Sequence, residues 1–86
     1  MGITYFFWDP NKEVSVKAAW WFARAVKNRF GRNYRVWTPL QNIKDGSWST
    51  WVDVCGDKVP DHKALADHAL KFYRAKYAEN HGSDEK

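Results

Sequence analysis

The sequence contains a single cysteine and has no long apolar run. The only cysteine among the 86 residues is Cys55, so the chain cannot close a disulfide within itself. No stretch approaches the roughly 20 apolar residues that a membrane-spanning helix needs. The first ten residues have neither a basic region nor a small-residue cleavage site, so no signal peptide is predicted. These absences predict a cytoplasmic protein, in which Cys55 serves as a small core residue.

The patterns by which enzymes and metal sites are recognised are also missing. The histidines form neither a His-Glu-x-x-His nor a Cys-x-x-Cys pattern, and two of them fit structural positions on a helix. Three aspartates between positions 53 and 61 suggest a metal-dependent nuclease, but no glycine-rich phosphate loop accompanies them. We therefore expect no catalysis, no metal and no cofactor. The three histidines are His62, His68 and His81.

Aromatic residues, in contrast, are abundant. The chain has 6 Trp, 4 Tyr and 5 Phe, which make 17% of it aromatic although 28% of it is charged. A domain of this size buries only about 60% of the surface that its unfolded chain exposes, so it needs bulky side chains for its core. We expect one folded domain over residues 1–81, followed by a polar tail at 82–86 that frays.

Hydrophobic periodicity predicts an α+β domain in the order β-α-β-β-α, with a three-stranded sheet packed by two helices. The first strand is apolar on both faces, which favours a central place in the sheet. Ser15 is a candidate N-cap for the first helix, and Gly31 its stop. Asp61 is a candidate N-cap for the second helix. The expected strands span residues 3–8, 34–43 and 47–55, and the expected helices span 15–30 and 61–80.

The second and third strands are expected to form a hairpin. Asp45-Gly46 is a strong signal for a two-residue turn, because its central residues require positive φ. That turn would place Leu40 opposite Trp51. Pro39 cannot donate a ladder hydrogen bond, so its strand should be an edge or carry a bulge at that residue.

The first helix is predicted to be amphipathic, with Trp20 in its core stripe and Trp21 on the solvent side. Apolar residues recur at steps of three and four, and the opposite face is basic. This phase predicts that Trp20 is buried and that Trp21 is exposed. The expected core stripe consists of Val16, Ala19, Trp20, Ala23, Lys27 and Phe30.

Positive charge is concentrated in the same region. The net charge is +4, and no acidic residue lies between positions 17 and 35, where six Lys and Arg residues occur. Cations neutralise phosphates with release of counterions, and an exposed aromatic ring can stack on an unpaired base. The pattern predicts a nucleic-acid-binding site, most readily for RNA, on the first helix and the turn after it. Its candidate residues are Lys17, Trp21, Arg24, Lys27, Asn28, Arg29, Arg32 and Arg35.

A second candidate surface is the sheet face that two helices would leave uncovered. Tyr34, Leu40 and Trp51 are expected on it. Such a face binds single-stranded RNA in RRM-type sheets, or it closes a homodimer. The RRM aromatic signature is absent, which favours a homodimer or coverage by the second helix.

In size and tryptophan content the chain resembles small early proteins of tailed phages. Several of these antagonise host machinery, among them RNA-binding inhibitors of toxin–antitoxin ribonucleases. The resemblance implies an antitoxin-like inhibitor of a host defence factor, and it carries over no site residue. The alternative is a protein-interaction module whose basic face docks on an acidic or nucleic-acid-binding host protein without RNA.

Overall fold

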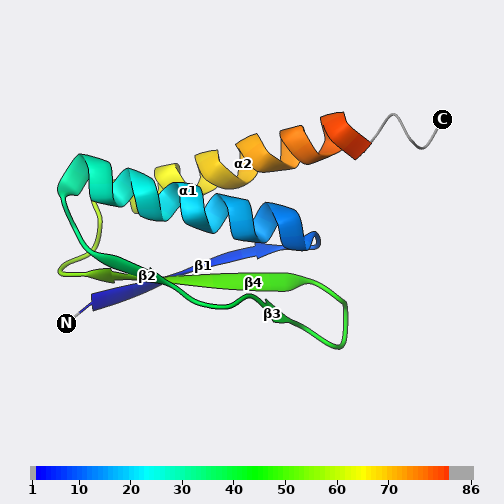
Figure 1. Ribbon diagram of the computed structural model, residues 1–86, viewed down its shortest axis with the longest axis horizontal. Coiled ribbons are helices and arrows are strands. Elements are labelled where there is room, and N and C mark those ends of the chain that lie inside the picture. The colour runs from blue at the N-terminus through cyan, green and yellow to red at the C-terminus, as the bar shows by residue number, and fades with distance from the viewer. Residues whose placement is uncertain (1, 82–86) are drawn as a thin grey trace.

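A computed structural model describes residues 2–81 as two helices packed on one side of a four-stranded antiparallel sheet (Figure 1). The predicted α+β class and the predicted order of helices and strands are confirmed. The second expected strand is divided in two, which gives four strands instead of three. The tail at 82–86 and the side chain of His81 lie outside the described part of the chain. The elements are β1 (Gly2–Asp9), α1 (Lys12–Phe30), β2 (Tyr34–Val36), β3 (Leu40–Gln41), β4 (Trp48–Cys55) and α2 (His62–His81).

The central strand of the sheet is β4, and the expectation that β1 lies in the centre is wrong. β1 pairs with one side of β4, and β2 and β3 pair with the other. In β1 the side chains of Tyr5 and Phe7 are buried, whereas those of Phe6 and Trp8 are exposed. The strand is apolar on both faces because one face packs against the helices and the other carries exposed aromatic rings. That pattern does not require a neighbouring strand on each side.

The predicted register of the hairpin is also wrong. Leu40 pairs with Ser49 and not with Trp51. Val36 pairs with Val52, so three residues (37–39) lie opposite only two (50–51). One extra residue on an edge strand is a β-bulge. The prediction that the strand containing Pro39 is an edge or carries a bulge is confirmed on both counts.

The loop between β3 and β4 explains the shift in register. The Ser47 carbonyl accepts a hydrogen bond from the Asn42 N–H at 2.8 Å, and the Asn42 carbonyl accepts one from the Gly46 N–H at 2.7 Å. These bonds close a four-residue loop instead of the expected two-residue turn. Gly46 has the predicted positive φ, at 75°. The Asp45 carboxylate accepts bonds from both the backbone N–H and the hydroxyl of Ser47, and these bonds lower its pKa.

The predicted phase of the first helix is wrong. Trp20 is 39% exposed and Phe30 is also exposed, whereas Trp21 is half-buried between the two helices. The row Val14, Ala18, Phe22 and Val26 has equally good helical spacing. The small side chains of Ala18 and of the adjacent Ala19 and Ala23 let α1 lie close to the sheet. Trp20 is displaced to the edge of this contact. The residues that α1 buries are Val14, Ser15, Ala18, Ala19, Phe22, Ala23 and Val26.

The beginning of α1 differs from the expectation, and its end agrees with it. The helix begins at Lys12, after Asn11, so Ser15 is not its cap. The Ser15 hydroxyl is buried and lies 2.6 Å from the Phe7 carbonyl, to which it donates a hydrogen bond. The helix ends at Gly31, which has a left-handed φ of 66°, as predicted.

Polar contacts attach α2 to the sheet. The Val59 N–H donates to the Tyr5 hydroxyl at 2.8 Å, and the Tyr5 ring contacts His62, consistent with a structural role for that histidine. The Arg74 guanidinium lies 2.5 Å from the buried carboxylate of Asp9. The second helix and the loop before it are thereby fixed near the middle and at the end of β1. No helix within residues 2–81 is long and apolar enough to cross a membrane.

Candidate nucleic-acid interface

The outer surface of α1 carries an open depression of about 400 Å³ that reaches α2. A neighbouring depression of about 330 Å³ lies further along α1 and shares Trp21 and Arg24 with the first. We call the combined surface the α1 groove. The residues that define it are Lys17, Trp20, Trp21, Arg24, Asn28, Arg29 and Tyr73.

The α1 groove is a row of cations with an indole ring on each side. Trp20 lies on the β2 side, where its ring meets Tyr34 edge-on with 6.2 Å between centroids. Trp21 lies on the α2 side, where its ring centroid is 5.3 Å from that of His68. The Arg24 guanidinium lies 5.8 Å from the centre of the Trp20 ring. A cation and a partly exposed aromatic face are therefore available side by side.

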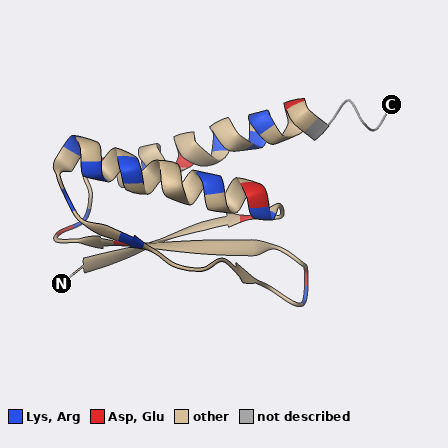
Figure 2. Cartoon of the chain, in the orientation of Figure 1, with Lys and Arg blue, Asp and Glu red and all other residues tan. Residues whose placement is uncertain are grey.

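Positive charge dominates this surface. Figure 2 shows basic positions along the length of α1 and an acidic one, Glu13, near its start. Lys17 pairs with Glu13 at 3.5 Å, but both side chains are about half exposed. Such a surface pair contributes roughly 0–1 kcal/mol, so a phosphate can compete for Lys17.

Aromatic side chains of α2 extend the groove beyond what the sequence suggested. His68 stacks on Phe72 at 6.4 Å, and Phe72 contacts Tyr73 edge-on at 5.1 Å. Phe72 is exposed, and the Lys76 ammonium lies 5.8 Å from the centre of its ring. The apolar periodicity of the second helix by itself would place both Phe72 and Tyr73 in its core arc. The spacing of His68, Phe72 and Lys76 at four-residue steps is the signal that could have identified this exposed row.

Two of the predicted site residues are held in structural contacts at the end of α1. The Lys27 ammonium donates to the Asn33 side-chain oxygen at 3.0 Å. The Arg32 guanidinium donates to the Asp57 carbonyl, which joins the turn after α1 to the loop before α2. Arg32 therefore has a bridging role in the fold. The structure brings together Lys17, Trp21, Arg24, Asn28 and Arg29 of the predicted set.

Arg35, the last predicted residue, lies on the other side of the sheet. It pairs with Asp53 in the register of β2 and β4, and its guanidinium lies 3.9 Å from the centre of the Trp37 ring. Sequence proximity had placed Arg35 in the basic patch, but strand alternation turns it away from the helices.

The side of the sheet opposite the helices forms a second exposed surface, which we call the open sheet face. The prediction that Leu40 and Trp51 are exposed on it agrees with the structure. Tyr34 instead lies on the helix side, because it pairs with the buried Val54. The principal residues of the open sheet face are Phe6, Trp8, Arg35, Trp37, Leu40, Trp51 and Asp53.

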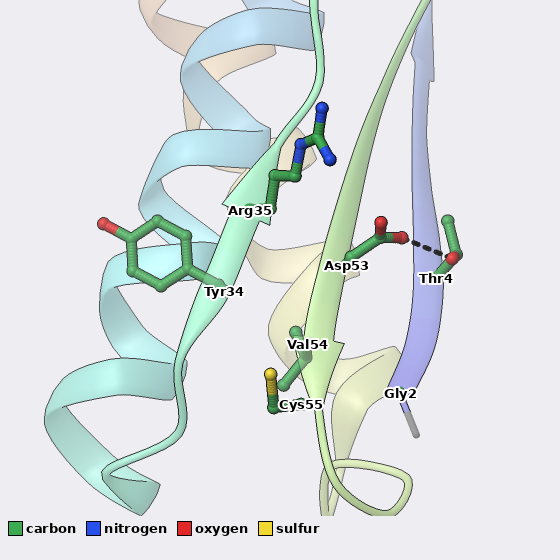
Figure 3. Close-up of a pocket in the computed structure, with 7 residues that line it drawn as sticks. All are labelled: Gly2, Thr4, Tyr34, Arg35, Asp53, Val54 and Cys55. Atoms are coloured by element: carbon green, nitrogen blue, oxygen red, sulfur yellow. Dashed lines mark hydrogen bonds between the residues drawn. The ribbon is translucent and has the colours of Figure 1, made fainter.

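Asp53 is the polar centre of this face. Its carboxylate accepts hydrogen bonds from the Thr4 hydroxyl at 2.5 Å and from the Trp37 indole N–H at 2.7 Å. These bonds, that of Thr4 foremost, lower the pKa of Asp53. A depression of about 440 Å³ lies beside it, at the end of the sheet where β1, β4 and β2 meet (Figure 3). Its lining residues are Gly2, Thr4, Tyr34, Arg35, Asp53, Val54 and Cys55.

Cys55 is exposed, so its interpretation as a core residue is wrong. Strand alternation explains this, because the neighbouring Val54 takes the buried position at this end of β4. Within the described residues, no group of three or more His, Cys, Asp or Glu side chains is arranged to hold a metal ion.

The fold and its surfaces define a small α+β domain with one helical layer, one exposed sheet face and a basic aromatic groove along α1. Comparison of the chain with protein-family models, curated proteins and solved structures finds no match.

Proposed function

We propose that this protein binds single-stranded RNA along the α1 groove. The observation that carries the proposal is the position of Arg24, which is exposed and lies between the partly exposed Trp20 and the half-buried Trp21. Cations attract the phosphates of any nucleic acid, whereas exposed aromatic faces stack only on bases that are not paired. The combination favours a single strand over a duplex.

The arrangement also suggests how a strand would lie. Lys17, Arg24 and Asn28 are seven and four residues apart, which places them along one side of the helix. Phosphates would follow this row, and one base would stack on Trp20. The Asn28 amide both donates and accepts hydrogen bonds, which suits a ribose 2′-hydroxyl. In keeping with the resemblance to phage proteins, we propose that this binding serves to inhibit a host defence factor such as a toxin ribonuclease.

The direct test is RNA affinity as a function of salt, measured by fluorescence anisotropy with a labelled single-stranded RNA. Replacing Lys17, Arg24 and Arg29 together by Gln should weaken binding and reduce the slope of log affinity against log salt. The expected reduction is about 0.7 for each phosphate that is no longer neutralised, or roughly 2 in total. Circular dichroism should show an unchanged fold, because all three side chains are exposed or only partly buried.

The matched control replaces Lys58, Lys63 and Lys71 by Gln. These three lysines are exposed, and they lie in the loop before α2 and on α2, outside the residues that line the α1 groove. Replacing them removes the same formal charge as the first triple variant. Arg74 is unsuitable for the control because it pairs with the buried Asp9. If both triple variants lose affinity equally, the attraction is to net charge alone and the proposed site is wrong.

The stacking step has a separate test. Trp20→Ala should lower RNA affinity by about 1–3 kcal/mol without changing the salt slope, because it removes a stacked base while every phosphate stays neutralised. A wild-type protein that binds neither RNA nor single-stranded DNA at about 50 mM salt, where electrostatic attraction is strong, would exclude the proposal. Capture of a host protein that survives nuclease treatment would then support the protein-docking alternative.

A further inference from the structure

The open sheet face carries an extended group of exposed apolar side chains. Its four aromatic residues, Phe6, Trp8, Trp37 and Trp51, are 36 to 61% exposed, and Leu40 is 55% exposed. With about 150–250 Å² for each large aromatic side chain, the four rings expose roughly 300–450 Å². The largest apolar patch on a typical monomer is of this size, about 300–600 Å², and is often an interaction surface.

That area matches the apolar part of a protein–protein interface. A standard interface buries about 800 Å² on each partner, and somewhat more than half of that area is apolar. The four rings and Leu40 therefore supply about the apolar surface that one side of such an interface needs. The polar residues that complete it are present on the same face, at Thr4, Arg35 and Asp53.

The charges on this face distinguish between a nucleic acid and a protein as its partner. Arg35 is its cation, and the neighbouring Asp53 is an anion whose hydrogen bonds to Thr4 and Trp37 lower its pKa. A carboxylate at the centre of the face repels phosphate. The cations of α1 lie on the opposite side of the molecule, above the helical layer (Figure 2). The two faces of the domain are therefore chemically separate.

We propose that the open sheet face is the interface of a homodimer, in which two copies of this chain pack sheet against sheet. A twofold axis brings the same patch of both copies together, so the patch must be complementary to itself. Arg35 and Asp53 satisfy this condition, because they are neighbours on adjacent strands. A twofold axis that passes between them places Arg35 of one copy opposite Asp53 of the other. The α1 cations of both copies then point outward, which keeps two chains of net charge +4 from repelling each other at the contact.

Sedimentation velocity in the absence of nucleic acid tests the proposed homodimer. Protein concentrations of about 1–100 μM cover the dissociation constants of the weaker dimers of standard interface size. The wild type should approach twice the monomer mass of 10.1 kDa as concentration rises. Leu40→Glu should raise the dimer dissociation constant more than about 100-fold, because the interface would then bury an unpaired carboxylate from each copy. Ile43→Glu is the matched control, since it replaces an aliphatic residue that is 97% exposed in the loop off this face. It should dimerise like the wild type.

A charge exchange tests whether Arg35 and Asp53 lie in the contact between the two copies. Arg35→Glu alone leaves two acidic groups on the face, and Asp53→Lys alone leaves two basic groups, so each variant should remain monomeric. An equimolar mixture of the two should recover a dimer, because each copy then meets the opposite charge.

Three results would overturn the inference. The first is a wild type that stays monomeric over the whole concentration range. The second is a Leu40→Glu variant that dimerises normally. Dimerisation by pairing of two β1 edges would give that result, because Leu40 belongs to β3, which lies on the other side of β4 from β1. The third is a charge-exchange mixture that stays monomeric. A monomeric wild type that loses RNA binding on Leu40→Glu would assign the face to RNA instead. Since dimerisation is measured without RNA, failure of the RNA proposal leaves these outcomes unchanged.

Discussion

At the scale of single residues, three consecutive aromatic side chains in α1 occupy three environments. Trp20 rests edge-on against Tyr34, Trp21 contacts His68 of α2, and Phe22 is fully buried beneath the helix. Successive residues of a helix point about 100° apart, so only one of the three can face the sheet. The Phe22 ring lies between those of Tyr5 and Phe7, at 5.0 and 5.1 Å. Phe22 is thus the aromatic centre of the core.

Removing these side chains should have unequal costs. Phe22→Ala should reduce the free energy of unfolding by about 3–5 kcal/mol, since it leaves a cavity among packed rings. Trp20→Ala should cost less, because over a third of that side chain is already in water. Urea denaturation of both variants measures the difference. A larger loss for Trp20→Ala would support the helical phase predicted from periodicity instead.

At the scale of elements, Pro39 and a β-bulge divide the strand after α1 into β2 and β3. Pro39 cannot donate to the ladder, and the extra residue at 37–39 separates β2 from β3. The Trp37 N–H still donates to the Trp51 carbonyl at 2.9 Å, so the bulge is anchored to β4. This anchoring leaves the Trp37 indole close enough to bond with Asp53 on the open sheet face. An irregularity in an edge strand therefore shapes the proposed dimer surface.

The loop that follows depends on Gly46. Gly46→Val should destabilise the protein by about 1–3 kcal/mol, because a β-branched residue is strained at positive φ. The nearest atom to a Cβ at this position is 3.9 Å away, so crowding makes no contribution. Gly46→Asn should cost less, since Asn tolerates the left-handed region. Thermal melting of both variants tests this ranking, and equal melting temperatures for Gly46→Val and the wild type would contradict the loop geometry.

At the scale of the whole molecule, the helices and the sheet form two layers with different surfaces. The outer side of the helical layer is basic and aromatic, and the outer side of the sheet is apolar with one balanced pair of charges. Figures 1 and 2 show the two layers and the basic positions along α1. The layers are tied together at the end of β1, where Arg74 pairs with Asp9. Asp9 also accepts a hydrogen bond from the Asn11 N–H at 2.9 Å. One carboxylate thus supports both the turn into α1 and the docking of α2.

Removing the Arg74–Asp9 ion pair should weaken the packing of α2 on the sheet. Arg74→Ala should cost about 1–3 kcal/mol, because it removes a partner from a buried carboxylate. Lys71→Ala, a nearby exposed cation on the same helix, should change stability by no more than about 0.5 kcal/mol. Chemical denaturation measures both. In a double-mutant cycle, Asp9→Asn should remove most of the effect of Arg74→Ala, and additive losses would show that the two groups do not interact.

Several local features of this protein follow from its amino-acid sequence alone. Periodicity and turn residues predicted the α+β class, the order of elements, the stop at Gly31 and the positive φ of Gly46, because these depend on neighbouring residues. The concentration of cations on α1 was likewise visible, since it is a property of one helix. Burial of Phe22 was missed because two apolar rows of α1 have acceptable spacing, and only the sheet and α2 together select one of them.

Which residues share a surface depends instead on how distant segments pack. Strand pairing moved Arg35 to the open sheet face beside Asp53, and docking of α2 added Tyr73 to the α1 groove. The order of strands put β4 in the centre, although β1 has the more continuous apolar run. These outcomes require contacts between segments far apart in the chain. Local propensity cannot specify them, because each segment satisfies its own pattern equally well in several mutual arrangements.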